Sequence, residues 1–251
     1  KPGIRKYNVL GRSGLEVSDI SLGGACKMQK LRYALDRGIN LYDTAEQYHS
    51  GQHEAYVGKA FKDVRDRVIV VDKHVHGLAA EISREDVISR FDDSLRRMES
   101  DYIDIAMLHH VADPAMFQHE ELLGAYETLK QQGKFRFFGF STHDAEAVIP
   151  AAIESGLIDV MLIIYNSIQY PERSEMITRA REVAEARLEA DEDDLEGTSL
   201  KGIPIMVPAD RLNEASDIIT ARDEMDEHIL AGPDALVSAD DEEDDLTGPH
   251  I

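Results

Sequence analysis

The sequence has very little cysteine and no long apolar run. Cys26 is the single cysteine among 251 residues, so no disulfide can form within the chain. A reducing compartment is therefore the default expectation. No apolar stretch approaches the ~20 residues that a membrane-spanning helix needs, and no apolar signal core follows the first six residues. These absences predict a soluble protein of the cytoplasm without a membrane partner.

Basic residues are scarce relative to acidic ones. The chain has 27 lysines and arginines against 49 aspartates and glutamates, which gives a net charge of -22. Two runs, residues 189–194 and 240–245, hold eleven of the acids, and without them the net charge would still be -11. Binding to a nucleic-acid backbone needs clusters of lysine and arginine, so we expect no nucleic-acid partner. We interpret the two runs as solvated segments; adaptation to a salty host is the weaker alternative.

Short apolar runs alternate with amphipathic segments along most of the chain. A small hairpin is predicted over residues 7–18, because a glycine-bearing turn at residues 11–14 separates two short extended runs. Strands are predicted next at residues 19–24, 39–42, 68–71, 103–108, 135–140 and 160–165. Helices are predicted between and after them at residues 30–37, 54–61, 83–98, 121–132, 144–154 and 172–188. This alternation indicates a parallel sheet with crossover helices.

Eight strand–helix units close a barrel, whose active site lies at the carboxyl ends of the strands. An open doubly wound sheet is the competing architecture, but it usually binds a dinucleotide through a Gly-x-Gly-x-x-Gly turn after the first strand, and residues 23–25 do not supply one. Beyond residue 200 only one strand (202–207) and one helix (210–230) are predicted. We therefore expect an α/β fold, a (β/α)₈ TIM barrel with an N-terminal β-hairpin whose last two units are incomplete or rearranged. It would occupy residues 1–232, before an acidic disordered tail at 233–251.

Four polar residues stand at or just beyond the ends of predicted strands. Asp43 ends the second strand, Tyr48 follows it on a loop, Lys73 ends the third strand and His109 ends the fourth. Taken singly, Asp43 could cap a strand end, Tyr48 could be a loop aromatic, and His110 could be the exposed neighbour of His109. Lysine, however, is rarely buried unpaired. Their shared placement at strand ends predicts one site.

Four segments, in order along the chain, resemble signatures of the aldo-keto reductase family. They are residues 10–18 (LGRSGLEVS), residues 38–45 (GINLYDTA) followed by Tyr48, Gly51 and Glu54, residues 101–104 (DYID) leading to His109, and residues 133–141 (GKFRFFGFS). The resemblance covers about residues 7–170. It implies a (β/α)₈ barrel and an oxidoreductase that reduces a small aldehyde or ketone to an alcohol with NADPH.

The resemblance also implies a role for each residue of the site. Tyr48 would be the general acid that protonates the carbonyl oxygen, a task for which a free phenol is too weak an acid near neutrality. Lys73 would favour the phenolate, Asp43 would hold Lys73 by an ion pair, and His109 would orient the carbonyl. The NADP site implied by the family would consist of Asp43, Ser141, Thr142, Asn166 and Arg211. Thr142 and Leu162 stand where the family usually has asparagine and glutamine, and Asp210 beside Arg211 would repel a phosphate.

Two other hypotheses remain. A barrel without turnover could act as a binding or regulatory protein, which the shortened last quarter would explain. A metal-dependent barrel hydrolase could use His74 and His76, since histidines at i and i+2 of a strand face one way, together with His109, His143 or Asp43. The second hypothesis leaves Tyr48 and Lys73 without a task, so we predict no metal ligand.

Overall fold

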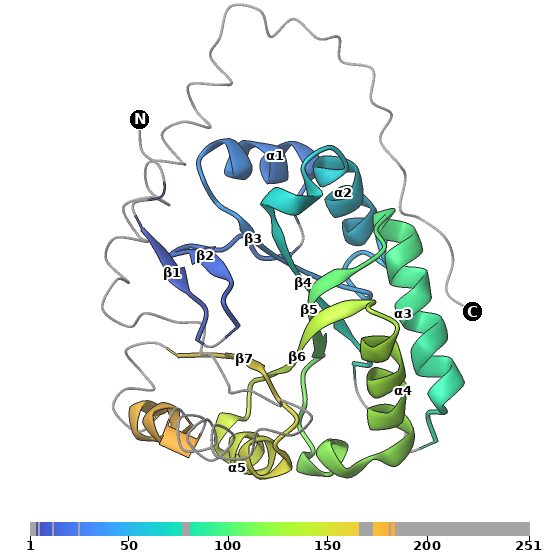
Figure 1. The fold of residues 1–251 in the computed structure, drawn as a ribbon, viewed down its shortest axis with the longest axis vertical. Coiled ribbons are helices and arrows are strands. Elements are labelled where there is room, and N and C mark those ends of the chain that lie inside the picture. Colours follow the sequence, from blue (N-terminus) through green and yellow to red (C-terminus); the bar gives the residue numbers. More distant parts are fainter. Residues whose placement is uncertain are drawn as a thin grey trace, which may run out of the picture. The chain divides into compact units, whose positions relative to one another are not determined.

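The computed structural model describes residues 4, 6–11, 13–24, 26–76, 81–165, 173–180 and 182–183. Within this part of the chain five parallel strands form one sheet in the order β3–β4–β5–β6–β7, and two antiparallel strands form a separate hairpin (Figure 1). The strands of the sheet are β3 (Leu41–Ala45), β4 (Ile69–His74), β5 (Ile103–Leu108), β6 (Phe135–Thr142) and β7 (Val160–Ile163). The strand order follows the chain order, as it does for successive units of a (β/α)₈ barrel.

A helix follows each of the strands β3 to β6. The helices are α1 (Met28–Asp36), α2 (Gln52–Phe61), α3 (Arg84–Met98), α4 (Glu120–Gln131) and α5 (Ala145–Ser155), with 3₁₀ turns η1 (Arg65–Arg67) and η2 (Pro114–Gln118). Figure 1 shows α2, α3 and α4 side by side along one face of the sheet. Ser83 and Asp86 form the capping box of α3, Asp144 caps α5, and Gly156 ends α5 at a φ of 69°. The predicted alternation of strands and helices is confirmed.

The two faces of the sheet are buried by different partners. Strand side chains such as Tyr42, Val70 and Phe138 pack against the helices. On the other face a second cluster joins the sheet to the hairpin of β1 (Tyr7–Val9) and β2 (Glu16–Ser18). Its members are Leu10, Leu15, Val17, Leu41, Ile69, Val71, Ile105, Met107 and Val160. The hairpin thus covers the amino ends of the strands on the interior face, which leaves their carboxyl ends for polar residues.

The strand boundaries differ from the sequence prediction in ways that affect the site. The strand predicted at residues 19–24 is reduced to one parallel bridge between Leu22 and Tyr42, because Gly23 and Gly24 offer no side chains to pack on a sheet. In contrast, β3, β4 and β6 run two to three residues further than predicted, to Ala45, His74 and Thr142. Asp43 and Lys73 therefore lie inside strands rather than after them.

The last quarter of the predicted barrel cannot be compared. The strand predicted at 202–207, the helix at 210–230, the domain boundary at residue 232 and the tail at 233–251 lie outside the described residues. Residues 173–180 are helical, as expected for the start of the helix predicted from residue 172. Of the helices that the structure describes, none combines the length and apolar character needed to cross a membrane.

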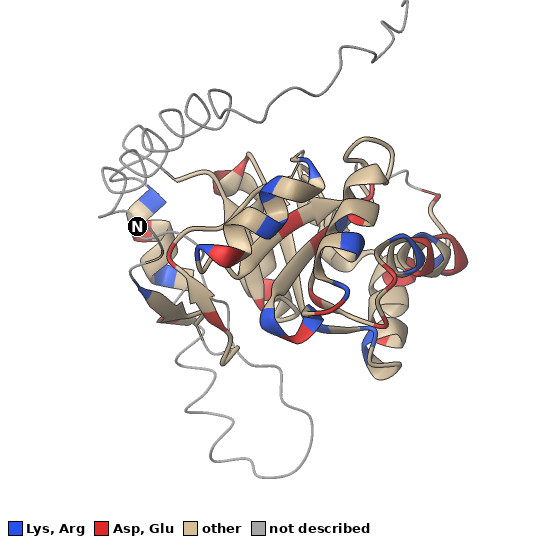
Figure 2. Ribbon diagram, turned by 90° about the horizontal axis from the view of Figure 1, so that it is seen from above, with Lys and Arg blue, Asp and Glu red and all other residues tan. Residues whose placement is uncertain are grey.

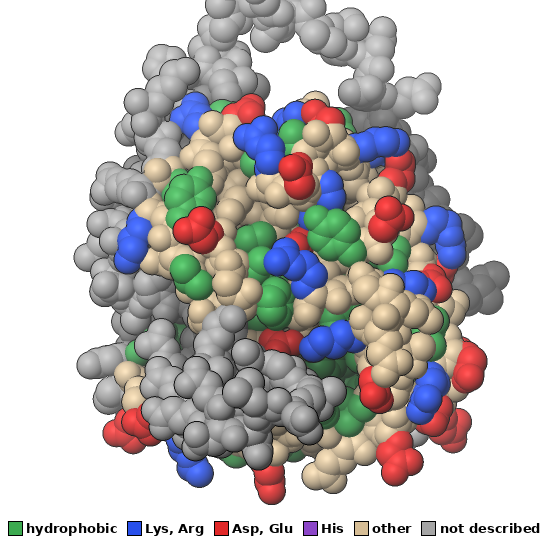
Figure 3. Space-filling view, viewed as in Figure 1, with side chains coloured by type: hydrophobic (Ala, Val, Ile, Leu, Met, Phe, Trp, Pro, Cys, Tyr) green, Lys and Arg blue, Asp and Glu red, His purple; other side chains and the backbone are tan. Residues whose placement is uncertain are grey.

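Charged residues of both signs are spread over the described helices and loops (Figure 2). Surface pairs such as Arg32–Asp63 and Lys62–Glu99, each 2.6 Å apart, illustrate the mixing. The face in Figure 3 carries basic side chains interspersed with acidic ones. This face does not present the continuous basic stripe that a nucleic-acid-binding surface needs.

Candidate functional site

The carboxyl ends of β3, β4 and β5 bring the predicted site residues together. Side chains alternate along a strand, so Asp43, Lys73 and His109 share the interior face with Leu41, Val71 and Met107. The loop after β3 is tied to its neighbours, because the backbone N–H of Glu46 donates to Lys73 O at 3.1 Å and that of Tyr48 to Ala45 O at 3.0 Å. Strand register and this short turn therefore fix the backbone position of Tyr48.

Lys73 and Asp43 form a buried ion pair. The Lys73 side chain is 2% exposed and that of Asp43 16%, and the ammonium donates a hydrogen bond to Asp43 Oδ2. Burial raises the pKa of Asp43, whereas the attraction of Lys73 and a backbone N–H of Gly24 act against that rise. The pair holds the Lys73 cation on the interior face of the sheet, at the carboxyl ends of the strands.

Tyr48 lies over this cation and beside His109. The Lys73 ammonium is 4.9 Å from the centroid of the Tyr48 ring, within range of a cation–π interaction. The Tyr48 and His109 rings meet edge to face, with centroids 5.7 Å apart. Asp43, Lys73, Tyr48 and His109 thus form one contiguous chain of contacts, as the sequence pattern predicted.

His109 is a neutral imidazole near neutral pH. Burial, followed by the charge of Lys73, lowers its pKa to about 4. Its backbone N–H donates to His74 O at 2.8 Å, while its buried Nδ1 makes no hydrogen bond to any described residue. A buried nitrogen without a partner costs free energy, and a neutral imidazole can donate or accept at such a position. Because Nδ1 is closed to solvent while the residue as a whole is only partly buried, a ligand would meet the exposed part of the His109 ring.

Ser141 and Thr142 lie on opposite faces of β6. Ser141 is half-buried on the interior face, where its Oγ accepts a hydrogen bond from the His110 N–H at 2.9 Å. Thr142 is 1% exposed; its hydroxyl donates to Val111 O at 2.6 Å and accepts from the Asp144 N–H at 3.0 Å. Ser141 thus lies toward the interior face, whereas the Thr142 hydroxyl links the loop after β5 to the start of α5. Asn166 and Arg211 lie outside the described residues.

A buried histidine behind Tyr48 was absent from the sequence prediction. His53 Nδ1 lies 2.8 Å from Thr44 Oγ1, its Nε2 lies 3.8 Å from Cys26 Sγ, and its ring meets the Tyr48 ring edge-on at 6.2 Å. Burial lowers the pKa of His53 to about 4. The helix was predicted to begin at residue 54, one residue after His53, whereas α2 begins at Gln52. The earlier start places it on the buried face of α2.

His74 and His76 do not share a face. The His74 ring is buried against Phe91 of α3, with centroids 4.7 Å apart. His76 is exposed and lies near the rings of His109 and His110, at 5.0 and 5.3 Å. Val75 between them has a φ of 57°, which ends the strand alternation on which the i, i+2 prediction depended. The alternative metal site, which needs His74 and His76 on one face of a strand, is therefore not supported by the geometry of these two residues.

The lowered pKa values of His53 and His109 predict that acid destabilises the fold. The unfolded chain takes up a proton on each near pH 6.5 and the folded chain only near pH 4. Between these values the unfolded state binds more protons, so the free energy of unfolding falls as the pH falls. Between pH 7 and pH 4.5, measured by urea titration, we expect the free energy of unfolding to fall by roughly 1–3 kcal/mol less in His53→Gln than in the wild type. His143→Gln, at an exposed position, is the control, and parallel profiles of His53→Gln and wild type would contradict the prediction.

Known proteins resemble this chain in sequence. A family model described as "Aldo/keto reductase family" matches residues 17–180. The putative voltage-gated potassium channel subunit beta of Schizosaccharomyces pombe is 34% identical over 159 residues, which cover 55% of this chain and 46% of that protein. Aldo-keto reductase YhdN of Bacillus subtilis is 32% identical over 161 residues, 56% of this chain and 48% of that protein. The chain thus spans about half the length of these relatives.

Solved structures share the fold. Aldo-keto reductase AKR11C1 from Bacillus halodurans, in its holo form, is 31% identical with a TM-score of 0.54, over 64% of this chain and 57% of that one. An aldo/keto reductase from Klebsiella pneumoniae, solved in complex with NADP and acetate, is 23% identical with a TM-score of 0.58, over 82% of this chain and 85% of that one. The second likeness concerns the fold alone.

Proposed function

Because the chain belongs to the aldo-keto reductase family, we propose that it reduces a small aldehyde or ketone to an alcohol with NADPH. The observation that carries this proposal is the contiguous arrangement of Asp43, Lys73, Tyr48 and His109 at the carboxyl ends of the strands. A proton donor, a cation to stabilise the donor's anion and a neutral hydrogen-bonding group stand side by side. Carbonyl reduction requires these three functions of a protein.

Two features of the described residues support a place for the nicotinamide end of the cofactor beside Tyr48. Ser141 presents a half-buried hydroxyl on the interior face, suited to a carboxamide. Gly24 lies against the Tyr48 ring so closely that a Cβ there would overlap two ring carbons, which keeps the surface beside Tyr48 flat. Ser141 and Asp43 would hold the cofactor here, and Asn166 and Arg211 remain the proposed ligands elsewhere. When bound, NADPH supplies the hydride.

The chain's own residues would deliver the proton. His109, neutral around pH 7, donates a hydrogen bond to the carbonyl oxygen and so orients the substrate. Tyr48 then gives its phenolic proton to the same oxygen as negative charge develops there. The Lys73 ammonium over the ring stabilises the phenolate that remains, and Asp43 keeps Lys73 in place. Each role depends on a contact between neighbours in the cluster.

Oxidation of NADPH in the presence of a panel of aldehydes and ketones tests the proposal. We expect loss of NADPH absorbance that depends on at least one carbonyl compound and on enzyme concentration. Equal amounts of alcohol formed and NADPH consumed would identify the reaction as reduction. Absence of carbonyl-dependent oxidation across the panel would refute the proposed activity.

Gly24→Ala is expected to lower kcat by at least ~10-fold, since small displacements of a catalytic group are costly. The added methyl would overlap the Tyr48 ring and push the phenol away from the carbonyl. Global stability should change little, because the ring can move toward solvent. Gly23→Ala is the matched control, as a Cβ at Gly23 meets no atom within 4 Å. Steady-state kinetics of both variants check the prediction, and equal kcat values would contradict it.

A barrel that binds NADPH without turnover is the second candidate. The similarity to a relative named as a putative potassium channel subunit beta favours it, because that name describes a subunit rather than an enzyme. Fluorescence titration with NADPH discriminates between the two functions. Tight binding without carbonyl-dependent oxidation would support the second candidate, whereas binding with turnover would exclude it.

A further inference from the structure

Tyr48, the proposed proton donor, stands on a loop beyond the paired part of β3. The ladder between β3 and β4 ends with the pair Ala45 and Lys73. The Tyr48 N–H donates to Ala45 O at 3.0 Å, a bond within β3 and its own loop. Such local bonds shape the turn but do not set its distance from the neighbouring strand. That distance depends on contacts between the loop and β4.

Glu46, the first residue of this loop, contacts the end of β4 twice. Its backbone N–H donates to Lys73 O at 3.1 Å. Its side-chain Oε1 accepts a hydrogen bond from the Val75 N–H at 2.8 Å. The Glu46 side chain is 11% exposed, so water competes little for its carboxylate. The loop is therefore attached to β4 at two points, one at Lys73 and one just beyond it.

Val75 needs the acceptor that Glu46 supplies. Val75 is 1% exposed and has a φ of 57°, a backbone region that β-branched residues rarely adopt. Such a conformation persists only where surrounding contacts hold it, and a buried N–H without an acceptor costs free energy. The bond to Glu46 meets both needs.

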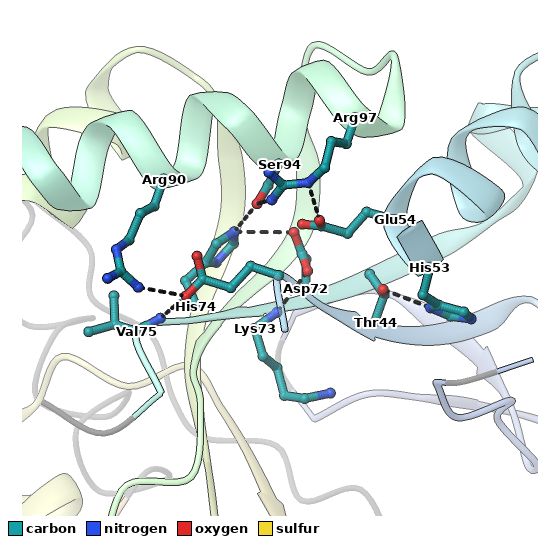
Figure 4. A network of polar contacts seen from close by, with 11 residues as sticks. Thr44, His53, Glu54, Asp72, Lys73, His74, Val75, Arg90, Ser94 and Arg97 are labelled. Atoms are coloured by element: carbon teal, nitrogen blue, oxygen red, sulfur yellow. Dashed lines mark hydrogen bonds and ion pairs between the residues drawn. The ribbon is translucent and has the colours of Figure 1, made fainter. Parts of the chain in front are cut away.

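Arg90 of α3 is the second partner of the same carboxylate oxygen. Its Nη1 lies 3.2 Å from Glu46 Oε1, and Figure 4 shows the arginine extending from α3 toward Val75. The Arg90 side chain is 50% exposed, so solvent screens the ion pair and limits its contribution. The reach of the Glu46 side chain to Val75 therefore matters more than its charge opposite Arg90.

The part of β4 that Glu46 binds is itself anchored to α3. Asp72 Oδ1 accepts a hydrogen bond from the Lys73 N–H at 3.0 Å. His74 Nε2 lies 3.2 Å from Asp72 Oδ2 and 3.1 Å from Ser94 Oγ of α3. These three side chains are at most 1% exposed and lie on the α3 side of the strand, whereas Lys73 points the other way (Figure 4). The end of β4 thus offers a fixed reference for the loop.

We propose that Glu46 is a positioning residue that sets the distance between the Tyr48 phenol and the Lys73 ammonium. It precedes Tyr48 by two residues, and its two bonds hold the loop against the strand that carries Lys73. The ammonium lies 4.9 Å from the centroid of the Tyr48 ring, and a displacement of ~1 Å at a catalytic group can cost ~10²-fold in rate. This role rests on the proposed reductase activity, whereas the attachment of the loop to β4 does not depend on it.

Two conservative variants separate the reach of Glu46 from its charge. Glu46→Asp keeps the charge but withdraws the carboxylate by one methylene, whereas Glu46→Gln keeps an oxygen at the same distance and removes the charge. In steady-state kinetics of the full chain we expect Glu46→Asp to lower kcat by ~10-fold or more with KM within ~3-fold. Glu46→Gln should retain kcat within ~3-fold of the wild type. The reverse order, or wild-type kcat in both variants, would overturn the proposal.

Glu121→Asp is the matched control. Glu121 Oε2 accepts a hydrogen bond from the Arg84 N–H at 3.2 Å, and its Oε1 lies 3.8 Å from Arg84 Nη2. It thus combines a backbone N–H and a guanidinium, as Glu46 does, but it joins α4 to the start of α3. Its shortening should leave kcat unchanged. A loss of kcat equal to that of Glu46→Asp would show that the effect is not specific to the Tyr48 loop.

Hydrogen–deuterium exchange measures the attachment of the loop without any substrate. We expect the peptides that cover residues 46–50 and 73–76 to exchange ~10-fold faster in Glu46→Asp than in the wild type, and at the wild-type rate in Glu46→Gln. Unchanged exchange in Glu46→Asp would overturn the attachment. A wild-type chain without reductase activity would refute the proposed function alone, and exchange would then decide whether Glu46 holds the loop. If Glu46→Asp fails to fold, Glu46→Gln decides, since a ~10-fold loss of its kcat would contradict a role that depends on reach.

Discussion

Tyr48→Phe is expected to lower kcat for carbonyl reduction by ~10²–10⁴-fold, the range that a positioned general acid contributes. The substitution removes the phenolic proton and leaves the ring, so the contacts with Lys73 and His109 persist. NADPH affinity should therefore stay within ~3-fold of the wild type. Steady-state kinetics and a fluorescence titration of the cofactor separate the two effects.

Tyr102→Phe provides the matched control for this variant. Tyr102 precedes β5 at the amino end of the sheet, where its ring stacks with Arg65 at 4.1 Å. Its loss of a hydroxyl should leave kcat unchanged. Full activity of Tyr48→Phe would remove Tyr48 from the reaction and leave the cluster without a proton donor.

Lys73→Met is expected to lower kcat by ~10²-fold or more, comparable to the loss of one electrostatic group at a reacting centre. The variant keeps the length of the side chain but removes the cation beside Tyr48 and Asp43. Without it the phenolate formed on proton transfer lacks a counter-charge. The buried Asp43 also loses the partner that opposes its raised pKa and would take up a proton at a higher pH.

Lys134→Met is the control for charge removal. Lys134 forms an ion pair with Asp92 at 2.5 Å near the start of β6, and its side chain is 25% exposed. Surface pairs of this kind contribute ~1 kcal/mol or less, so activity and folding should change little. Equal losses of kcat in Lys73→Met and Lys134→Met would show that the cation at residue 73 has no special role.

The sequence predicted the fold well where each element has its own local signal. Ser83 with Asp86 and Asp144 with Gly156 mark helix ends by their side chains and backbone conformations, and β5 has the bounds that its apolar run predicted. Asp43, Lys73 and His109 could be placed together because parallel strands end at one edge. Their grouping follows from topology and needs no knowledge of packing.

Other features depend on which helix packs against which strand, and no local pattern carries that information. The buried group of Glu54, Asp72 and His74 joins residues from α2 and β4 under α3, so it emerges only in three dimensions. Val75, with a φ of 57°, separated His74 from His76 where a regular strand would have aligned them. Thr142 turned toward Val111 because β6 runs two residues beyond its predicted end.

The most direct measurement of the proposed activity follows deuterium from NADPH labelled at nicotinamide C4. The purified chain is incubated with this cofactor and an aldehyde, and the alcohol is examined by mass spectrometry. If Asp43, Lys73, Tyr48 and His109 form a working reductase, the alcohol carries one deuterium on the former carbonyl carbon, and Tyr48→Phe yields almost none in the same time. Unlabelled alcohol, or no alcohol from the wild-type chain with NADPH bound, would contradict the proposed function.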